Sequence, residues 1–300
     1  MKILLFGKNG QVGWELQRSL APLGQVVALD RHSREHCGDL SDLAGLTQTV
    51  QALRPDVIVN AAAHTAVDKA ESEPELARTL NALAPGALAQ AAQSVGAWLL
   101  HYSSDYVFDG SGEQPWSETD ATGPLSVYGR SKLEGEQLIQ AHCAKHLIFR
   151  TSWVYAARGG NFAKTMLRLA KERDSLSVID DQFGAPTGAE LLADVSAHAL
   201  RQVLHAQCPR PDLAGSYHLG AAGVTSWHGY AQWVLQAALD AGVALRAKPQ
   251  DVLAVPTTCY PTPARRPLNS RLDCSRLESA FGLTLPPWQQ GVLRMLSETL

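Results

Sequence analysis

The sequence predicts a Rossmann-like α/β fold, in which a doubly wound parallel sheet is joined to a smaller C-terminal α/β substrate domain. Short β-rich runs alternate with helical patterns through the first half of the chain, a glycine-rich turn follows the first run, and prolines gather in the second half. Such alternation is typical of a parallel sheet covered by helices. We expect residues 1–150 to form the main domain and residues 151–300 mainly the second, with some segments returning to the main sheet.

Each expected element rests on its own local pattern. Short runs of apolar and β-branched residues predict strands at Ile3–Phe6, Val26–Leu29, Val57–Asn60, Trp98–Tyr102 and Leu147–Arg150. Helical spacing predicts helices near Val12–Leu20, Leu43–Leu53, Glu75–Ser94, Tyr128–Cys143, Ala189–Val203 and Tyr230–Ala241. Residues 109–124 are rich in Gly, Ser, Pro and Asp, which predicts a surface loop.

The composition indicates a globular protein with a sizeable core. Hydrophobic residues make up 45% of the 300, and 26 basic against 29 acidic residues give a net charge of -3. Because there is no basic excess, we expect neither nucleic acid nor a membrane as partner. The apolar run at the N-terminus is too short for a signal peptide or a membrane span. Scattered cysteines without a CxxC pattern predict reduced thiols in a cytoplasmic protein: Cys37, Cys143, Cys208, Cys259 and Cys274.

The glycine-rich turn has the pattern of a dinucleotide-binding site. The segment GKNGQVG at Gly7–Gly13 follows a strand and opens a helix, whose N-terminus offers unpaired N–H groups to a pyrophosphate. For so short a pattern, an ordinary glycine turn is the alternative. The residues expected to contact the cofactor here are Gly7, Asn9, Gly10, Gln11, Val12 and Gly13.

The adenosine end of the cofactor is expected beside the second strand. Asp30 stands where an acidic residue accepts hydrogen bonds from ribose hydroxyls, although a surface turn residue would look the same. Arg31 follows and could pair with a 2′-phosphate, so NADH and NADPH both remain open as cofactors. Asp39 and Leu40 are expected to flank the adenine.

A tyrosine and a lysine at helical spacing predict acid–base chemistry on a carbonyl group. Tyr128 and Lys132 lie on one face of the expected helix, and a neighbouring cation brings the pKa of a phenol, ordinarily about 10, toward the working range. An isolated YxxxK pattern more often marks a half-buried tyrosine beside a solvated lysine. Here Ser104, at the end of an expected strand, faces the same crevice and can polarise a carbonyl, although Ser103 could take that place.

Taken together, the motifs resemble those of the extended short-chain dehydrogenase/reductases and, within them, the dTDP-4-dehydrorhamnose reductase family. The resemblance spans essentially the whole chain. Its segments are GKNGQVG at 7–13, NAAAHTAVDKAE at 60–71, SSDYVFDG at 103–110, YGRSK at 128–132, RTSWVY at 150–155, DQFGAPT at 181–187 and RRPLNSRLD at 265–273. The family usually has Thr where this chain has Ser104; Ser keeps the hydroxyl but lacks the methyl group that restricts its rotamer.

The resemblance implies reduction of dTDP-4-dehydro-L-rhamnose to dTDP-L-rhamnose with NADPH or NADH. Tyr128 would protonate the substrate oxygen, Lys132 would support Tyr128 and the nicotinamide ribose, and Ser104 would orient the carbonyl. Contacts to the cofactor are implied for Ala62, Ala63, Tyr102, Tyr128 and Lys132. Contacts to the dTDP-sugar are implied for His64, Thr65, Ser104, Asp105 and Trp153.

The resemblance also implies a metal ion. Some bacterial relatives bind magnesium between subunits through glutamates that match Glu15, Glu190 and Glu298, so Mg²⁺ and a homodimer are further expectations. Two of these, Glu15 and Glu190, would otherwise look like ordinary solvated helix residues.

Three other functions compete with reduction. A 4,6-dehydratase of the superfamily would carry an Asp-Glu pair after the strand-end hydroxyl, but Tyr106 follows Asp105 here. An epimerase shares the Tyr/Lys chemistry but retains its NAD. A non-catalytic regulatory subunit can share the fold, but the intact Tyr128 and Lys132 argue against loss of catalysis.

Overall fold

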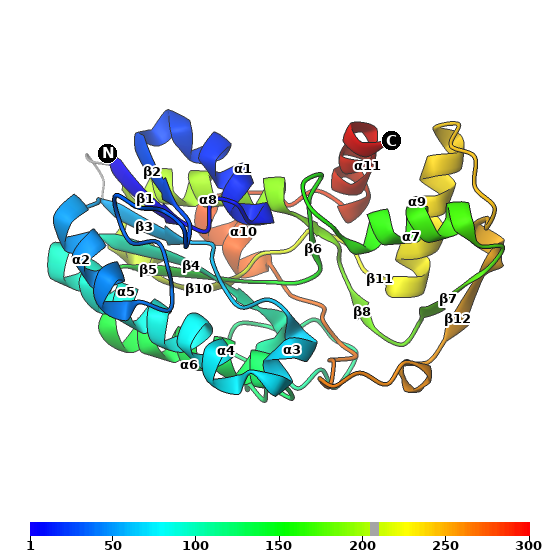
Figure 1. The fold of residues 1–300 in the computed structure, drawn as a ribbon, viewed down its shortest axis with the longest axis horizontal. Coiled ribbons are helices and arrows are strands. Elements are labelled where there is room, and N and C mark those ends of the chain that lie inside the picture. Colours follow the sequence, from blue (N-terminus) through cyan, green and yellow to red (C-terminus); the bar gives the residue numbers. More distant parts are fainter. Residues whose placement is uncertain (205–209) are drawn as a thin grey trace.

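The computed structural model describes residues 1–204 and 210–300, and its centre is a six-stranded parallel sheet (Figure 1). The strand order is β10-β5-β4-β3-β1-β2, so the chain winds outward from β1 in both directions. The strands are β1 (Lys2–Phe6), β2 (Gln25–Leu29), β3 (Val57–Asn60), β4 (Trp98–Ser104), β5 (His146–Thr151) and β10 (Gly215–His218). The predicted Rossmann-like class is confirmed.

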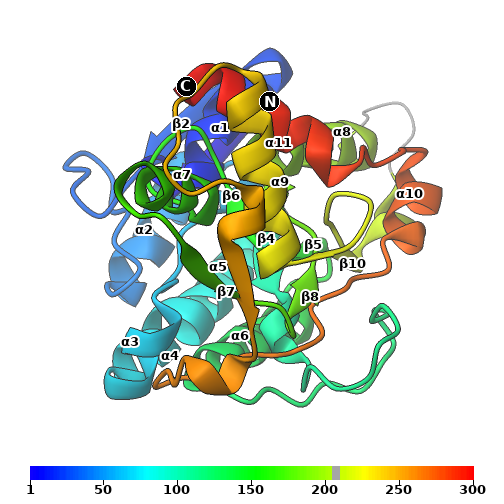
Figure 2. The same cartoon turned by 90° about the vertical axis from the view of Figure 1, so that its right-hand side faces the viewer.

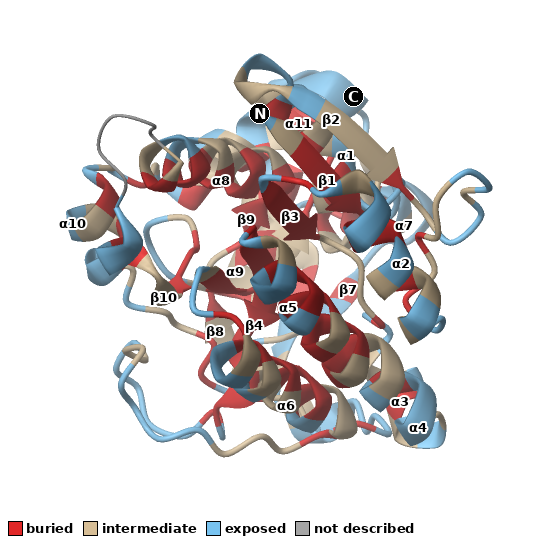
Figure 3. Ribbon diagram, turned by 90° about the vertical axis from the view of Figure 1, so that its left-hand side faces the viewer, coloured by how far each residue is buried: buried red, intermediate tan, exposed pale blue. Residues whose placement is uncertain are grey.

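Helices bury both faces of this sheet. On one face Ile3 and Leu5 pack in a core with residues of α1 (Gln11–Leu20), α8 (Ala189–Val203) and α10 (Ser275–Phe281). On the other face Leu4 and Phe6 pack with residues of α2 (Leu43–Leu53), α5 (Ala84–Val95) and α6 (Val127–His142). Figure 3 shows the buried strands between these helix layers. Since neither face meets water, the strands are nearly continuous apolar runs rather than alternating ones.

The prediction of a single helix near Glu75–Ser94 is wrong in one respect. The chain forms α4 (Pro74–Arg78), a π-helical turn over Thr79–Leu83 and then α5. Pro85 has no N–H to donate to the carbonyl of Asn81, four residues earlier, which loosens the helix at this point. The Asn81 carbonyl oxygen instead faces Gly135 of α6, where a Cβ atom would lie 2.1 Å from it.

A second, smaller core lies beyond the carboxyl ends of the main strands (Figure 2). It is built from α7 (Phe162–Glu172), α9 (Trp227–Asp240) and α11 (Trp288–Thr299). Three strand pairs join it: β6 (Val154–Tyr155) with β9 (Thr187–Gly188), β8 (Phe183–Gly184) with β11 (Thr225–Ser226), and β7 (Leu176–Ile179) with β12 (Val252–Val255). The sequence pattern predicted α8 and α9 but missed α7 and α11, as well as the short α3 (Val67–Ser72) and α10.

Two further features concern the cysteines and the character of the helices. Cys37, Cys143, Cys259 and Cys274 are free thiols, and Cys208 lies outside the described residues. Among the helices of residues 1–204 and 210–300, none combines the length and apolar character needed to cross a membrane.

Candidate active site

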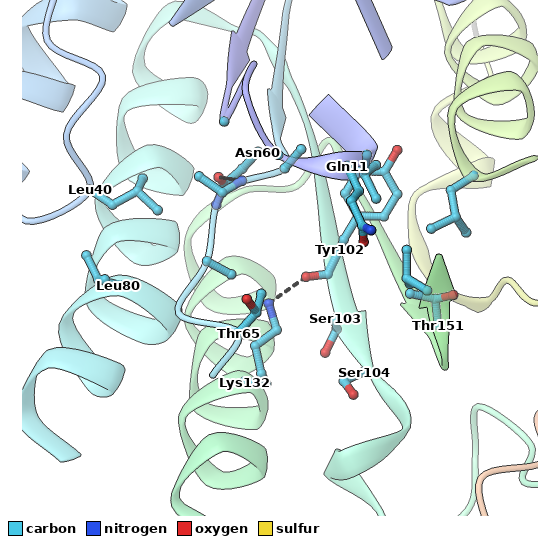
Figure 4. A pocket seen from close by; sticks show the side chains of 18 of the residues that line it. Gln11, Leu40, Asn60, Thr65, Leu80, Tyr102, Ser103, Ser104, Lys132 and Thr151 are labelled. Atoms are coloured by element: carbon cyan, nitrogen blue, oxygen red, sulfur yellow. Dashed lines mark hydrogen bonds between the residues drawn. The ribbon is translucent and has the colours of Figure 1, made fainter. Parts of the chain in front are cut away.

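A cavity of about 970 Å³ opens at the carboxyl ends of the parallel strands, where the second core faces the sheet (Figure 4). This is the position at which open α/β sheets bind ligands. Most of the residues expected from the sequence line it: Gly7, Asn9, Gly10, Gln11, Val12, Asp30, Arg31, Asp39, Leu40, Ala62, Ala63, Thr65, Tyr102, Ser104, Asp105, Tyr128, Lys132 and Trp153. Gly13 and His64 are not among them.

The glycine-rich turn forms a cradle that only glycine allows. Gly7 has φ +89°, and a Cβ atom there would lie 2.8 Å from the Ala62 nitrogen. A Cβ atom on Gly13 would lie 2.1 Å from the Gly7 carbonyl oxygen, so Gly13 serves close packing of α1 on the turn rather than contact with the cavity. Gly10 precedes α1 and offers no side-chain cap, which leaves the first N–H groups of the helix free for an anion. The cradle therefore fits a dinucleotide pyrophosphate.

Asp30, at the adenosine end, already has several partners within the chain. Its carboxylate accepts hydrogen bonds from Asn9 Nδ2 at 2.5 Å and from the His32 backbone N–H at 2.9 Å, and Lys8 Nζ lies 3.8 Å away. Burial acts to raise the pKa of Asp30, but the His32 N–H and the Lys8 charge outweigh it, so the pKa is lowered. Arg31 beside it is exposed and donates to His32 Nε2 at 3.1 Å.

Tyr128 lies in the first turn of α6, which Ser126 caps by accepting from the Gly129 N–H at 3.1 Å. The expectation that Lys132 brings the pKa of Tyr128 toward the working range is wrong for the free protein: burial raises this pKa to about 12. A hydrogen bond with Ser104 acts to lower it, and the charge of Asp105 to raise it. The Tyr106 ring packs edge-on, with ring centroids 5.4 Å apart. Tyr128 is thus a protonated phenol beside the strand-end serine.

Ser104 is held by its own turn. Its Oγ donates to Asp105 Oδ1 at 2.9 Å and accepts from the Tyr106 N–H at 3.2 Å. Burial raises the pKa of Asp105 to about 6, against the hydrogen bonds of Ser270 and Ser104 that act to lower it. Ser103 also lines the cavity, with no hydrogen-bond partner for its buried Oγ within the described residues, so both serines considered from the sequence reach this space.

Lys132 lies one helical turn after Tyr128, and its side chain is buried. Its Nζ donates to the Tyr102 carbonyl oxygen at 2.6 Å, the dashed contact in Figure 4, and lies 3.2 Å from His101 Nε2. Burial lowers the pKa of Lys132 to about 8, with Glu136 acting to raise it. His101 was not expected from the sequence; the available signal was a lone histidine inside the apolar run of β4.

His64 is not among the residues that line the cavity, and its expected contact with the substrate stays a prediction. Its buried ring is 3.4 Å from Glu73 rather than at the wall of the cavity. Asn81 holds its backbone, accepting from the His64 N–H at 2.8 Å and donating to the His64 carbonyl at 3.0 Å. Asn81 also donates to Ser131 Oγ at 3.0 Å, which ties this loop to α6. Asn81 therefore fixes the backbone between Ala63 and Thr65.

The three glutamates expected to bind magnesium between subunits do not form a ligand set within one chain. Burial raises the pKa of Glu190, and the charges of Glu15 and Glu298 add to it, so the three lie near one another. However, Glu15 pairs with Arg18 and Glu298 with Arg294, each at 3.5 Å. Within the described residues no group of three acidic, His or Cys side chains is arranged to hold a metal. Because the ion was expected at an interface between two subunits, the magnesium site stays a prediction.

Trp153 brings the second half of the chain to the cavity. Its φ of 48° is rare for a residue with a side chain, and its ring stacks on Trp227 with centroids 3.7 Å apart. Arg158 and Gly159 line the same side, and Gln11 Nε2 donates to the Arg158 carbonyl at 3.3 Å. The phosphate cradle is thus in direct contact with the loop between β6 and α7.

A Rossmann cradle that opens onto a partly buried tyrosine and a buried lysine defines the class: the chain is an oxidoreductase of the short-chain dehydrogenase/reductase type. The model of the family described as RmlD substrate binding domain matches residues 1–300. The dTDP-4-dehydrorhamnose reductase of Escherichia coli (strain K12) is 63% identical over 298 residues, which cover 99% of this chain and 98% of that one. The chain belongs to the dTDP-4-dehydrorhamnose reductase family.

Solved structures agree with this assignment. A dTDP-4-dehydrorhamnose reductase from Clostridium acetobutylicum matches with a TM-score of 0.88 at 36% identity, covering 99% of both chains. That of Bacillus anthracis, in complex with NADP, matches with a TM-score of 0.87 at 34% identity over 99% of both chains. A UDP-glucose 4-epimerase from Thermus thermophilus, 20% identical with a TM-score of 0.79 over 100% of this chain and 99% of its own, shares the fold alone.

Proposed function

We propose that this protein reduces dTDP-4-dehydro-L-rhamnose to dTDP-L-rhamnose with NADPH or NADH as the reductant. The observation that carries the proposal is the shared cavity: the glycine cradle, Ser104, Tyr128 and Lys132 all line it. The 63% identity to a dTDP-4-dehydrorhamnose reductase supports the choice of substrate.

The reduction requires the protein to supply one proton. The bound cofactor supplies two electrons and a hydrogen to carbon 4 of the sugar, and the ketone oxygen must then gain a proton. Tyr128 meets this demand because a phenol with a pKa near 12 is fully protonated at neutral pH and loses its proton only to a strongly basic oxygen. Ser104 lies beside Tyr128; its hydroxyl, which donates to Asp105 in the free protein, would turn to the same oxygen, where it fixes the carbonyl and polarises it.

The remaining contacts divide the cavity between cofactor and sugar. We place the adenosine at Asp30, Arg31, Asp39 and Leu40, with the exposed Arg31 able to meet a 2′-phosphate and Asp30 able to meet bare ribose hydroxyls. Trp153 presents a flat apolar ring on which the C–H face of a sugar can pack. The free thiols also fit a reducing cytoplasm, which we propose as the location.

One assay tests the proposal directly. Purified protein is mixed with NADPH or NADH, and the loss of absorbance of the reduced cofactor is followed on adding dTDP-4-dehydro-L-rhamnose. Turnover is expected with this sugar and much less with other 4-keto sugar nucleotides. An epimerase would instead retain tightly bound NAD after purification and consume no added cofactor. No oxidation of NADPH or NADH with any 4-keto sugar nucleotide would refute the proposed reaction.

A further inference from the structure

The tryptophan that lines the cavity is held in an unusual backbone conformation. Trp153 has φ of 48°, in the left-handed region that is unfavourable for any residue with a Cβ atom. Such strain persists only where the surrounding structure fixes it, and it clusters at ligand sites. The Trp153 carbonyl oxygen accepts from the Thr187 N–H at 3.1 Å, where β6 pairs with β9. This bond fixes the backbone of Trp153 and with it the direction of the side chain.

Thr187 ends a segment, DQFGAPT at 181–187, that the proposed reaction does not use. Gly184, in the middle of this segment, lies against the indole ring, and a Cβ atom there would be 2.9 Å from Trp153 Cε2. Real Cβ atoms do not approach so closely, so any side chain at this position requires a neighbour to move. The φ of Gly184 lies outside the left-handed region. Contact with the ring, not backbone conformation, therefore calls for glycine here.

The strand that carries Gly184 is hydrogen-bonded on both edges. On one edge β8 pairs with β11. On the other edge the Phe183 N–H donates to the Leu268 carbonyl and the Ser270 N–H donates to the Phe183 carbonyl, each at 2.8 Å. Because both edges are bonded, β8 cannot easily retreat from a larger side chain. The ring of Trp153 is the neighbour that would have to move.

A second indole ring covers one face of Trp153. The ring of Trp227, the first residue of α9, stacks on it with centroids 3.7 Å apart and 15° between the planes. Phe162 of α7 also packs on Trp227, with ring centroids 4.6 Å apart. Both Phe162 and Trp227 pack against the second core. The second core is thus connected to the cavity through Trp227.

The ring of Trp227 is itself fixed by hydrogen bonds to the 181–187 segment. Its Nε1–H donates to Gln182 Oε1 at 3.2 Å, and Gln182 Nε2 donates to Thr257 Oγ1 at 3.0 Å. Thr257 in turn donates from its N–H and its Oγ1–H to the Asp181 carboxylate, at 2.9 and 2.5 Å. Since an indole N–H can only donate, the orientation of the Gln182 amide is set, and every donor in this chain has an acceptor.

We propose that Gly184 and Trp227 are positioning residues for Trp153: they set where its ring lies in the cavity and thereby how closely the sugar packs on it. Dispersion attraction between an indole and the C–H face of a sugar depends steeply on distance, so a displaced ring binds less well. Residues 181–187 do not line the cavity themselves and act on it through Trp153. This inference rests on the proposed function for the contact between Trp153 and the sugar.

Gly184→Ala tests the contact with the smallest possible change. The added methyl group must displace the Trp153 ring, so KM for the sugar nucleotide should rise by about three- to tenfold. The affinity for NADPH and kcat should stay close to wild type. Gly220→Ala is the matched control, because a Cβ atom there lies at an ordinary 3.5 Å from Thr187 Oγ1. Steady-state kinetics in which Gly184→Ala and Gly220→Ala have the same KM overturn the role of Gly184.

Two substitutions of Trp227 test the stacked face. Trp227→Leu removes the ring and should raise KM, whereas Trp227→Phe keeps an aromatic face on Trp153 and should restore most of the substrate affinity. Trp233→Leu is the control, because Trp233 is also a half-buried residue of α9 but packs on Trp288, with ring centroids 5.1 Å apart. If Trp227→Leu and Trp233→Leu have the same KM, Trp227 does not position the wall.

A double-mutant cycle shows whether these residues act through Trp153. In a Trp153→Ala background there is no ring to displace, so adding Gly184→Ala or Trp227→Leu should leave KM unchanged. A residue that acts independently of Trp153 changes KM by the same factor in both backgrounds. Equal factors with and without the Trp153 ring therefore overturn the proposal.

The position of the ring can also be followed without any substrate. Indole N–H signals in NMR spectra of nitrogen-15-labelled protein respond to neighbouring rings, and the signal that disappears in Trp153→Phe belongs to Trp153. In Gly184→Ala this signal should move, while the signal of Trp98, at the start of β4, should stay in place. A Trp153 signal that does not move in Gly184→Ala overturns the role of Gly184.

The possible outcomes distinguish the two proposals. If wild type turns over no 4-keto sugar nucleotide, the proposed function fails, but the NMR signal of Trp153 still decides whether Gly184 sets the position of its ring. If Gly184→Ala fails to fold, as thermal melting would show, the two Trp227 variants and their cycle with Trp153→Ala decide the proposal.

Discussion

The two ends of the cavity differ in how strongly the protein has constrained their polar groups. At the catalytic end Lys132 is buried, bonded to Tyr102 and His101, and its pKa is lowered to about 8 by burial. At the adenosine end Arg31 is exposed and donates to its neighbour His32. Electrostatic interactions are strong where water is excluded and weak where it is not. Substitutions should therefore lose effect from the catalytic end to the adenosine end.

The largest effect is expected for Tyr128→Phe. Loss of the phenol proton should lower kcat by roughly a hundred- to ten-thousandfold, the usual weight of a general acid. NADPH affinity should barely change, because the hydroxyl acts on the substrate oxygen. Steady-state kinetics and cofactor titration measure the two. Tyr217→Phe, which removes a buried hydroxyl that donates to the Leu213 carbonyl, is the matched control. Near-normal turnover of Tyr128→Phe would remove Tyr128 from the mechanism.

Glu136→Gln tests the buried support beneath the catalytic helix. Glu136 and Arg150 form a two-pronged pair whose side chains are 1% and 6% exposed. Leaving the Arg150 charge without its partner should cost about 3–5 kcal/mol of unfolding free energy. Glu172→Gln, in the exposed pair with Arg168, should cost at most about 1 kcal/mol. Urea unfolding gives both values. Equal costs would show that burial does not set the strength of these pairs.

Trp153→Ala tests whether the indole ring forms a wall of the substrate pocket or is part of the hydrophobic core. As a wall that packs on the sugar, its loss should raise KM by about tenfold, or 1.4 kcal/mol, and leave NADPH binding intact. As core, its loss should cost about 3–5 kcal/mol of stability. Trp288→Ala, at 4% exposure in the second core, supplies the core reference. A badly unfolded Trp153→Ala whose folded fraction binds substrate normally would rule out the wall.

The smallest effect is expected for Asp30→Ala at the adenosine end. Without the carboxylate, NADH loses a hydrogen-bond partner for its ribose hydroxyls, and the 2′-phosphate of NADPH is no longer repelled. The ratio of the two cofactor affinities should therefore move toward NADPH by about fivefold, or roughly 1 kcal/mol. Cofactor titrations with each nucleotide measure the ratio. Asp56→Ala, whose carboxylate binds the Lys2 N–H away from the cavity, is the control. If neither cofactor binds Asp30→Ala differently from wild type, the acidic contact lies elsewhere.

Most of the sheet could be predicted from the sequence because its strands are short apolar runs with both faces buried. Helical spacing predicted α6 and α8 to within a residue at each end. The π-helical turn before α5 could also have been predicted, since Pro85 is visible in the sequence. Helix α7 was missed although Ala163, Leu167 and Ala170 follow helical spacing, because the prolines of the second half suggested irregular structure.

Local sequence patterns were sufficient for the glycine cradle after β1, the acidic residue after β2, and the spacing that places Tyr128 and Lys132 on one helical face. These features depend on neighbours within a few residues, so a short pattern is enough to encode them. What surrounds the lysine depends on tertiary packing instead. His101 and Asn60 come from two strands distant from α6 along the chain, and Asn81 holds the backbone of His64, which lies 17 residues earlier. Hydrogen-bond partners of buried groups are set by which strands and helices pack together, and the order of residues alone does not contain that geometry.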